Sequence, residues 1–343
     1  MPSSSSPRLG RRRFLQLLPI ATGAAVVRAK AETSAASRFP ISLAQWSLHR
    51  ALKGGQLDPL DWPAYTKKKF GLTALEHVNQ FFAQGDRAKD RYGLQPKPQD
   101  YFVELAKRIT GEGMRSVLIM CDGVGNLGDP DPARRTDAVE GHYAWLDTAL
   151  LLGCHAIRVN AGSDPKLMPE EQARLCADGL RRLSEAAAPR GLKVIVENHG
   201  GLSSDGAWLA SVMRMVNLGN CGTLPDFGNF YLVKNRGNAE DYERQKPLFV
   251  GRKTSEDEKG LFYDRYQGVT DLMPFAKGVS AKSHDFNDAG DEIHTDFARM
   301  MQIVAASGYS GHVGIEYEGD SLSEDEGILK TKALLERVLA TLG

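Results

Sequence analysis

The sequence predicts an α/β chain that folds as a (β/α)₈ barrel, and three observations predict it. From residue 41 onward, short runs of apolar and β-branched residues alternate with longer stretches of helical periodicity. Eight such pairs fill roughly 300 residues, which suits this barrel. Several of the short runs end in charged or polar residues, and barrel proteins gather their sites at the carboxyl ends of the strands.

The eight expected strands are short runs bounded by turn residues or by helical stretches. In chain order they are residues 41–48, 73–79, 114–122, 154–160, 191–198, 222–229, 276–286 and 311–319.

The stretches between the strands have apolar residues at three- and four-residue spacing, as amphipathic helices do. Gly153 stands where a helix ends and Pro169 where one begins. The expected helices cover residues 58–71, 98–110, 133–153, 169 onward, 205–216, 294–308 and 324–342.

The first 31 residues predict an export signal rather than part of the fold. An Arg11–Arg13 cluster precedes an apolar stretch that reaches Val27, and Ala29–Ala31 has the small-residue pattern of a cleavage site. The apolar stretch is shorter than the ~20 residues of a membrane span, so we expect no stable anchor after cleavage. Because "RRRFLQ" resembles a twin-arginine signal, we expect an exported protein, periplasmic or extracellular. The alternative is a chance basic N-terminus.

Residues 32–40 are expected to be a leader and residues 41–343 the barrel, with an insertion at about 230–275 that is a solvated stretch or a lid.

The 43 basic and 43 acidic residues give no electrostatic reason to expect nucleic acid as a partner. The four cysteines form no C-x-x-C pair and are expected to be buried. A homo-oligomer is compatible with this sequence.

Charged residues end four consecutive expected strands. "VIVENHGG" carries Glu197, "LPDFGN" Asp226, "AKSHDF" His284 and "GIEYEG" Glu316. Three carboxylates and an imidazole gathered in a dry barrel mouth would need a cation between them. An all-oxygen shell suits magnesium, whereas one nitrogen with three carboxylates suits manganese, cobalt or iron at least as well, with zinc as a further alternative. We expect one divalent ion, manganese first.

In these four motifs the sequence resembles the sugar phosphate isomerase/epimerase family, whose members have a xylose isomerase-like TIM barrel, over about residues 40–340. The resemblance implies that Glu197, Asp226, His284 and Glu316 hold the metal, and that Glu197 and Glu316 move the proton. It implies a metal-dependent isomerase or epimerase that passes through an enediolate of a keto-sugar or sugar derivative. The alternative is a lyase or dehydratase that uses the same site on a 3-keto-glycoside or keto-inositol.

The sequence departs from the epimerases of this family at two substrate-contacting places. Asn229 stands where they have a histidine, and no arginine follows His284 within "HDFNDAGDE". Export also favours a sugar that carries no phosphate. The expected substrate contacts are His199, Lys282, Asn229, Asn160, Trp46 and His77.

Three rival functions follow from other features. "GVGNLG" (123–128) matches a dinucleotide-binding pattern, but "DPDP" follows where a helix should open, so we expect a loop. An abasic-site endonuclease of this barrel would need more histidine ligands and a basic face. A non-catalytic sugar-binding barrel is the third rival.

Overall fold

The structure, a computed structural model, describes residues 38–86, 89–234, 243–257 and 260–342. The predicted export signal, residues 1–31, therefore lies outside the described residues. Within the described ranges, no helix has both the length and the apolar character that crossing a bilayer requires.

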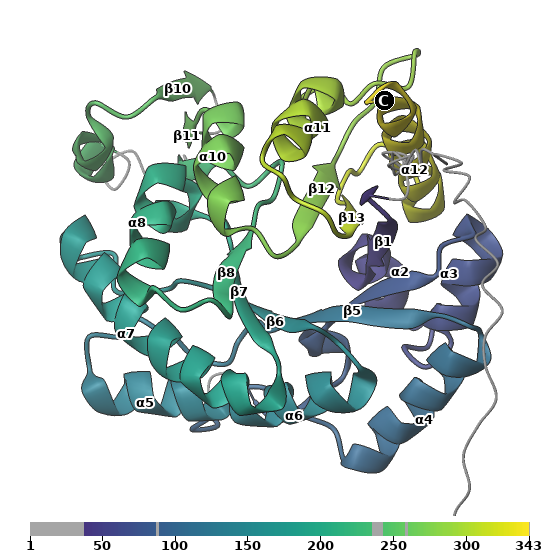
Figure 1. The fold of residues 1–343 in the computed structure, drawn as a ribbon, viewed down its shortest axis with the longest axis horizontal. Coiled ribbons are helices and arrows are strands. Elements are labelled where there is room, and N and C mark those ends of the chain that lie inside the picture. Colours follow the sequence, from purple (N-terminus) through teal and green to yellow (C-terminus); the bar gives the residue numbers. More distant parts are fainter. Residues whose placement is uncertain (1–37, 87–88, 235–242, 258–259, 343) are drawn as a thin grey trace, which may run out of the picture. The chain divides into compact units, whose positions relative to one another are not determined.

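A sheet of eight parallel strands forms the centre of the fold (Figure 1), as the sequence predicts. Neighbouring strands follow the chain order, and the eighth strand pairs with the first. The ring is closed between the sixth and seventh strands, where Asp226 pairs with Ser280 and Thr223 with Ala276. The strands are β1 (Ile41–Ala44), β2 (Ala74–Val78), β5 (Arg115–Met120), β6 (Ala156–Val159), β7 (Lys193–Glu197), β8 (Cys221–Leu224), β12 (Val279–Ser283) and β13 (Val313–Tyr317).

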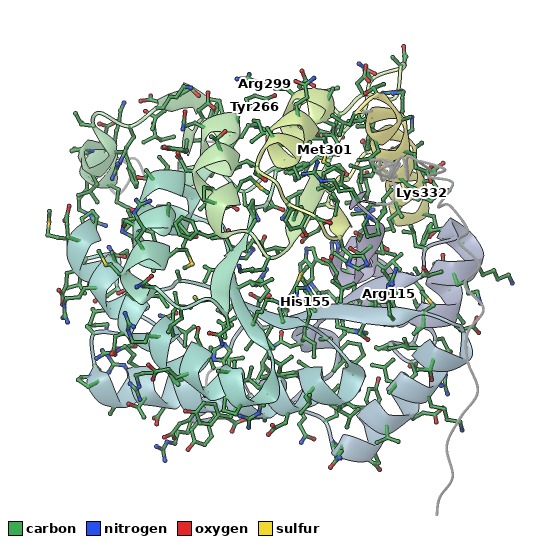
Figure 2. All side chains as sticks on the ribbon, in the orientation of Figure 1. Arg115, His155, Tyr266, Arg299, Met301 and Lys332 are labelled. Atoms are coloured by element: carbon green, nitrogen blue, oxygen red, sulfur yellow. The ribbon has the colours of Figure 1, made fainter. Side chains whose placement is uncertain are left out.

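Helices lie outside the ring of strands and follow them in the expected order (Figure 1). A cation–π contact joins two adjacent helices: Arg299 Cζ of α11 lies 3.8 Å from the centre of the Tyr266 ring of α10 (Figure 2). The helices are α2 (His49–Lys53), α3 (Trp62–Phe70), α4 (Gln99–Gly111), α5 (Pro132–Gly141), α6 (Tyr143–Leu152), α7 (Pro169–Ala187), α8 (Gly206–Val216), α10 (Arg265–Leu272), α11 (Phe297–Ala306) and α12 (Glu324–Thr341).

The expected helix at 133–153 is two helices, and His142 explains the break. Its ring Nδ1 lies 2.6 Å from the carbonyl oxygen of Ala138, which the backbone amide of His142 would bind in a regular helix. That amide turns to the carbonyl of Val139 instead. Gly153 ends α6 in a left-handed conformation with φ 74°, as predicted.

The long connection at 230–275 contains structure of its own, which the sequence reading did not anticipate. It forms a three-stranded antiparallel sheet followed by α10. Its strands are β9 (Tyr231–Lys234), β10 (Thr254–Asp257) and β11 (Gly260–Tyr263). The charged stretch within 251–257 is solvent-exposed, as expected, and Arg252 pairs with the buried Asp205 at 2.8 Å.

Two apolar clusters form the core. A small one fills the inside of the barrel with residues such as Ala44, Leu118 and Ile195, and a larger one lies between strands and helices. All four cysteines are buried, as predicted, and each is a free thiol. No helix follows "GVGNLG" directly: α5 opens at Pro132, after Asp131 has capped it, so the loop prediction is confirmed.

Candidate metal centre

Three of the four predicted metal ligands come together at the carboxyl ends of the strands. Glu197 ends β7, Asp226 lies just beyond β8, and Glu316 lies in β13. One oxygen of each carboxylate lies within 4.8 Å of the others. Their exposed fractions are 0%, 0% and 3%. Buried carboxylates this close repel one another unless a cation or a proton lies between them.

Strand alternation explains why these side chains meet. Successive side chains of a strand point to opposite faces, so Glu197 shares the barrel interior with Ile195, and Glu316 shares it with Gly314. Asp226 is fixed by its own loop: its Oδ1 accepts hydrogen bonds from the backbone amides of Gly228 (2.9 Å) and Asn229 (2.8 Å).

A serine hydroxyl lies between two of the acids. Ser280 Oγ is 2.7 Å from Asp226 Oδ2 and 3.0 Å from Glu316 Oε2. Burial raises the pKa of Asp226 to about 6, although Lys282 and the hydrogen bonds act against the rise. Burial also raises the pKa of Glu316 well above its ordinary value, and the neighbouring carboxylates add to this.

Lys282 is one of two buried cations beside the acids. Its Nζ lies 3.3 Å from Glu318 Oε2, 3.7 Å from Glu316 Oε1 and 3.3 Å from Asn229 Oδ1. Burial would lower the pKa of Lys282, but the surrounding carboxylates raise it well above its ordinary value. The side chain is only 3% exposed, so its charge acts mainly on the cluster.

Arg158 of β6 is the second buried cation, also 3% exposed. Its Nη1 lies 2.7 Å from Asp122 Oδ1 and its Nε lies 2.5 Å from Glu197 Oε2. Burial would raise the pKa of Asp122, but Arg158, with His199 and a hydrogen bond from Asn160, holds it well below its usual range.

The donor set fits a divalent cation. Glu197 Oε1 accepts a hydrogen bond from Asn229 Nδ2 at 2.8 Å, while Oε2 is buried and makes no hydrogen bond of normal geometry, its ion pair with Arg158 aside. The described part of the site holds five carboxylates (Asp122, Glu197, Asp226, Glu316 and Glu318) against two cations. A divalent ion would offset part of this excess, and Glu197, Asp226 and Glu316 would hold it.

His284, the fourth predicted ligand, lies near the cluster but is not among the atoms that meet within 4.8 Å. It follows β12, its backbone amide donates to Glu292 Oε1 (3.3 Å), and its ring stacks edge-on to His294 with centroids 6.2 Å apart. Burial lowers the pKa of His284, and the charge of Lys282 lowers it further, so the ring is neutral at pH 7. Its role as a ligand stays a prediction.

A cavity of about 250 Å³ opens beside the acids and contains three of the predicted substrate contacts. Glu316 also lines it, whereas Glu197 does not. Glu197 would raise the pKa of His199, but burial and the nearby cations outweigh it, so this ring is also neutral at pH 7. The predicted contacts that line the cavity are Trp46, Asn160 and His199.

The other predicted contacts lie elsewhere. Lys282 and Asn229 sit among the acids and bind them directly. His77 does not reach the mouth, so the expectation for it is corrected: alternation on β2 sends Glu76 inward and His77 outward. There His77 lies edge-on to Trp62 and Phe82, and its Nε2 is 2.8 Å from Ser116 Oγ.

Sequence reasoning missed Arg158, Asp122, Glu318 and Ser280. The sequence could have revealed Arg158, because strand alternation places it on the same face of the fourth strand as Ala156 and Asn160, the face inside the barrel. A charged residue at such a position requires a partner.

Glu76 lies deeper in the barrel, where Ser42 Oγ donates to its Oε1 at 2.5 Å and its Oε2 has no hydrogen bond. A side chain at Gly314 would collide with this carboxyl group, at 2.5 Å from the position of a Cβ atom. Burial raises the pKa of Glu76 from 4.5 to about 7. The hydrogen bond from Ser42 lowers this pKa, and the charge of Glu197 raises it. The folded protein therefore keeps a proton here that the unfolded chain releases.

We expect Glu76→Gln to remove a pH-dependent destabilisation. Because the folded pKa is the higher one, the wild type loses stability as the pH rises from 4.5 to 7, by about 3 kcal/mol in total. The variant cannot ionise there, so its free energy of unfolding relative to wild type should rise by about 2 to 3 kcal/mol between pH 5 and pH 8. Urea unfolding at both pH values measures it. The exposed Glu185→Gln serves as control, and parallel pH profiles for wild type and Glu76→Gln would contradict the expectation.

The fold and the site together define a (β/α)₈-barrel protein with an acidic cluster where barrel enzymes place their active sites. A family model described as "Xylose isomerase-like TIM barrel" matches residues 68–338. The chain belongs to this family. A comparison with curated proteins found no match.

Solved structures share the fold at low sequence identity. The 3-keto-D-glucoside 4-epimerase of E. coli is 16% identical, with 82% of this chain and 94% of that chain covered and a TM-score of 0.57. An IolI protein with a bound zinc atom is 14% identical (88% and 98% covered, TM-score 0.58). A xylose isomerase-like TIM barrel protein from Mycobacterium smegmatis in complex with magnesium is 14% identical (90% and 98% covered, TM-score 0.56). At these identities the likeness shows the fold alone.

Proposed function

We propose that the protein is a divalent-metal-dependent isomerase or epimerase that moves a proton on a keto-sugar or sugar derivative. The observation that carries this proposal is the meeting of Glu197, Asp226 and Glu316 beside a cavity that Glu316 lines. Membership of the family supports it, as do the sugar epimerases among the similar structures. The N-terminal sequence supports a substrate outside the cytoplasm, and fractionation of cells that make the full chain tests that location.

Glu316 is the proposed proton carrier, because it is the member of the triad that lines the cavity. A divalent ion held by the triad would supply Lewis acidity, which makes a carbon-bound proton beside a carbonyl easier to remove. Glu316 would then take that proton and return it to the neighbouring carbon, which isomerises the sugar, and burial favours its protonated form between the two steps. Inversion at a single carbon would need a second acid on the opposite face of the sugar, the part that Glu197 would play.

Other residues of the mouth position the substrate. Trp46, His199 and Asn160 line the cavity, and the indole offers a flat face to a sugar ring. Arg158 and Asn229 fix Glu197 from two sides. In the proposed site Glu197 therefore serves as a metal ligand, and its part in proton transfer requires that it turn toward the cavity.

A lyase acting on a 3-keto-glycoside is the second candidate. One observation favours it: His199, neutral and still carrying a proton, lines the same cavity as Glu316. Its ring N–H could donate a hydrogen bond to a departing oxygen, and Glu316 could pass to that oxygen the proton that it has taken from carbon.

Hydrogen exchange in heavy water tests the proposal. The enzyme is loaded with manganese and incubated with ketohexoses and 3-keto-glucosides, and the ion is removed before NMR spectra are recorded. We expect deuterium at one carbon of the recovered sugar or its epimer. Chelator-treated enzyme should lose at least about 100-fold in rate, and added manganese should restore it. An unsaturated sugar would favour the lyase, and no exchange with any of these sugars would contradict both candidates.

A further inference from the structure

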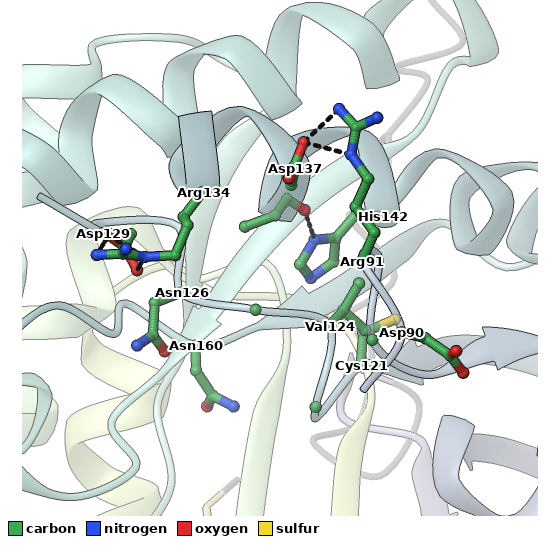
Figure 3. Close-up of a pocket in the computed structure, with 14 residues that line it drawn as sticks. Asp90, Arg91, Cys121, Val124, Asn126, Asp129, Arg134, Asp137, His142 and Asn160 are labelled. Carbon is green, nitrogen blue, oxygen red and sulfur yellow. Dashed lines mark hydrogen bonds and ion pairs between the residues drawn. The ribbon is translucent and has the colours of Figure 1, made fainter. Parts of the chain in front are cut away.

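A second cavity, of about 370 Å³ (Figure 3), adjoins the one beside the acids, because the two share lining residues. Gly123 and Asn160 line both cavities, and Asn160 also donates to Asp122 at 2.7 Å. The cavity beside the acids, at about 250 Å³, lies below the roughly 300–1,000 Å³ of ordinary ligand pockets, whereas the two together fall within that range. A ligand that occupied both would pass over Asn160.

His142 supplies an unpartnered polar atom in this second cavity. The side chain is 2% exposed and lines the cavity, and its Nδ1 donates to the carbonyl of Ala138 at 2.6 Å (Figure 3). Because a carbonyl can only accept, Nδ1 carries the proton and Nε2 is left as an acceptor. No residue in the described part of the chain hydrogen-bonds to Nε2. Burial lowers the pKa of His142 to about 4, so the ring stays neutral and Nε2 stays available at pH 7.

Both arginines that line the cavity are paired within the protein, whereas Asp90, which also lines it, makes no ion pair with a described residue. Arg91 binds Asp137 at 2.6 Å, and Arg134 binds Asp129 at 3.0 Å (Figure 3). An anionic ligand such as a phosphate would therefore meet no free guanidinium there among the described residues. A guanidinium and a carboxylate that pair with each other still have donor and acceptor atoms left for a ligand. This arrangement suits a neutral ligand with several hydroxyl groups.

We propose that this second cavity is a subsite for a second sugar ring, so that the substrate is a glycoside of at least two rings. The proposal rests on the proposed function. The reacting ring lies beside Glu316, the glycosidic link passes over Gly123 and Asn160, and the second ring donates a hydroxyl to His142 Nε2. The side chain of Asn126, exposed and without a hydrogen bond to any described residue, lies at the wall of this subsite.

The test compares two substrates, a 3-keto-glucosyl-glucose disaccharide and methyl 3-keto-glucoside. We expect wild-type kcat/KM to be at least about tenfold higher for the disaccharide, the factor that one or two good hydrogen bonds supply. Asn126→Trp would fill the subsite and remove this advantage, while the methyl glycoside reacts within about twofold of wild type. Arg134→Ala should reduce the advantage by raising the disaccharide KM. Gln302→Trp, on the exposed face of α11, is the matched control and should retain the full ratio.

Two results would overturn the subsite: equal kcat/KM values for the two substrates in wild type, or an unchanged ratio in Asn126→Trp. Turnover of the methyl glycoside in either case would leave the proposed function intact. If neither substrate reacts, the proposed function fails for these sugars, and saturation-transfer NMR decides the subsite by binding. Disaccharide signals that Asn126→Trp abolishes would support it, and signals that are absent in wild type or unchanged in the variant would contradict it.

Discussion

Glu316→Gln should lower turnover by about 10²- to 10⁴-fold, the range that removal of a general acid–base typically costs. Glutamine keeps the size of the side chain and can still accept from Ser280, which lies 3.0 Å from Glu316 Oε2, but it cannot take a proton from carbon. Steady-state rates with a sugar that exchanges deuterium in wild type measure the loss. Glu336→Gln, an exposed change on α12, is the matched control.

The stability of the same variant separates a chemical role from a structural one. Burial beside Asp226 and Glu197 already favours the uncharged form of Glu316, so an uncharged glutamine costs little there, and thermal unfolding without metal should occur at the same or a higher temperature. Substrate binding should largely survive. A variant that folds, binds sugar and turns over at near wild-type rate would show that Glu316 does not move the proton, and would favour a non-catalytic sugar-binding barrel if wild type also shows no turnover.

Arg158→Met should be the most destabilising of the substitutions considered. The guanidinium group is 3% exposed and pairs with both Asp122 and Glu197, at 2.7 Å and 2.5 Å. Methionine fits the space but leaves two buried carboxylates without their cation, which costs about 3–5 kcal/mol in comparable cases. Urea unfolding without metal measures it.

The exposed pair of Arg174 with Glu171 provides a control at a matching distance, 2.7 Å. Because solvent screens this pair, Arg174→Met should leave the unfolding midpoint unchanged. Equal unfolding midpoints for Arg158→Met and Arg174→Met would show that burial of the Arg158 pair carries no special cost. Added manganese should restore part of the stability of Arg158→Met, because an ion held by Glu197, Asp226 and Glu316 replaces the missing charge.

Much of the fold was predictable because parallel barrel strands are buried on both faces and appear as short apolar runs. The runs that end in Glu197 and Asp226 and the run that contains Glu316 gave the triad, since the carboxyl ends of all strands meet at one mouth. The runs did not show whether a given side chain points into the barrel or toward the helices. In "LEHV" both Glu76 and His77 are suitable site residues, and only the register of β2 in the sheet places His77 on the helix side.

Pairing across long sequence distances explains the other misses. Arg158 and Asp122 are 36 residues apart and Ser280 and Asp226 are 54 apart, so no local pattern links them. The break at His142 depends on one side chain that competes for a helical carbonyl, which periodicity does not register. The sequence of the insertion shows mainly a charged, polar stretch. Its antiparallel sheet depends on pairing between separate segments, and the pattern of charges does not reveal that pairing.

The pairing of Asp226 with Ser280 joins the two ends of the sheet at the same residues that shape the acidic cluster. The chain between these two residues contains the whole insertion. Lengthening a loop is thermodynamically cheap, about 0.6 kcal/mol for each doubling. A change in the length of that connection should therefore cost little stability and leave the ring of strands and the acidic cluster in place.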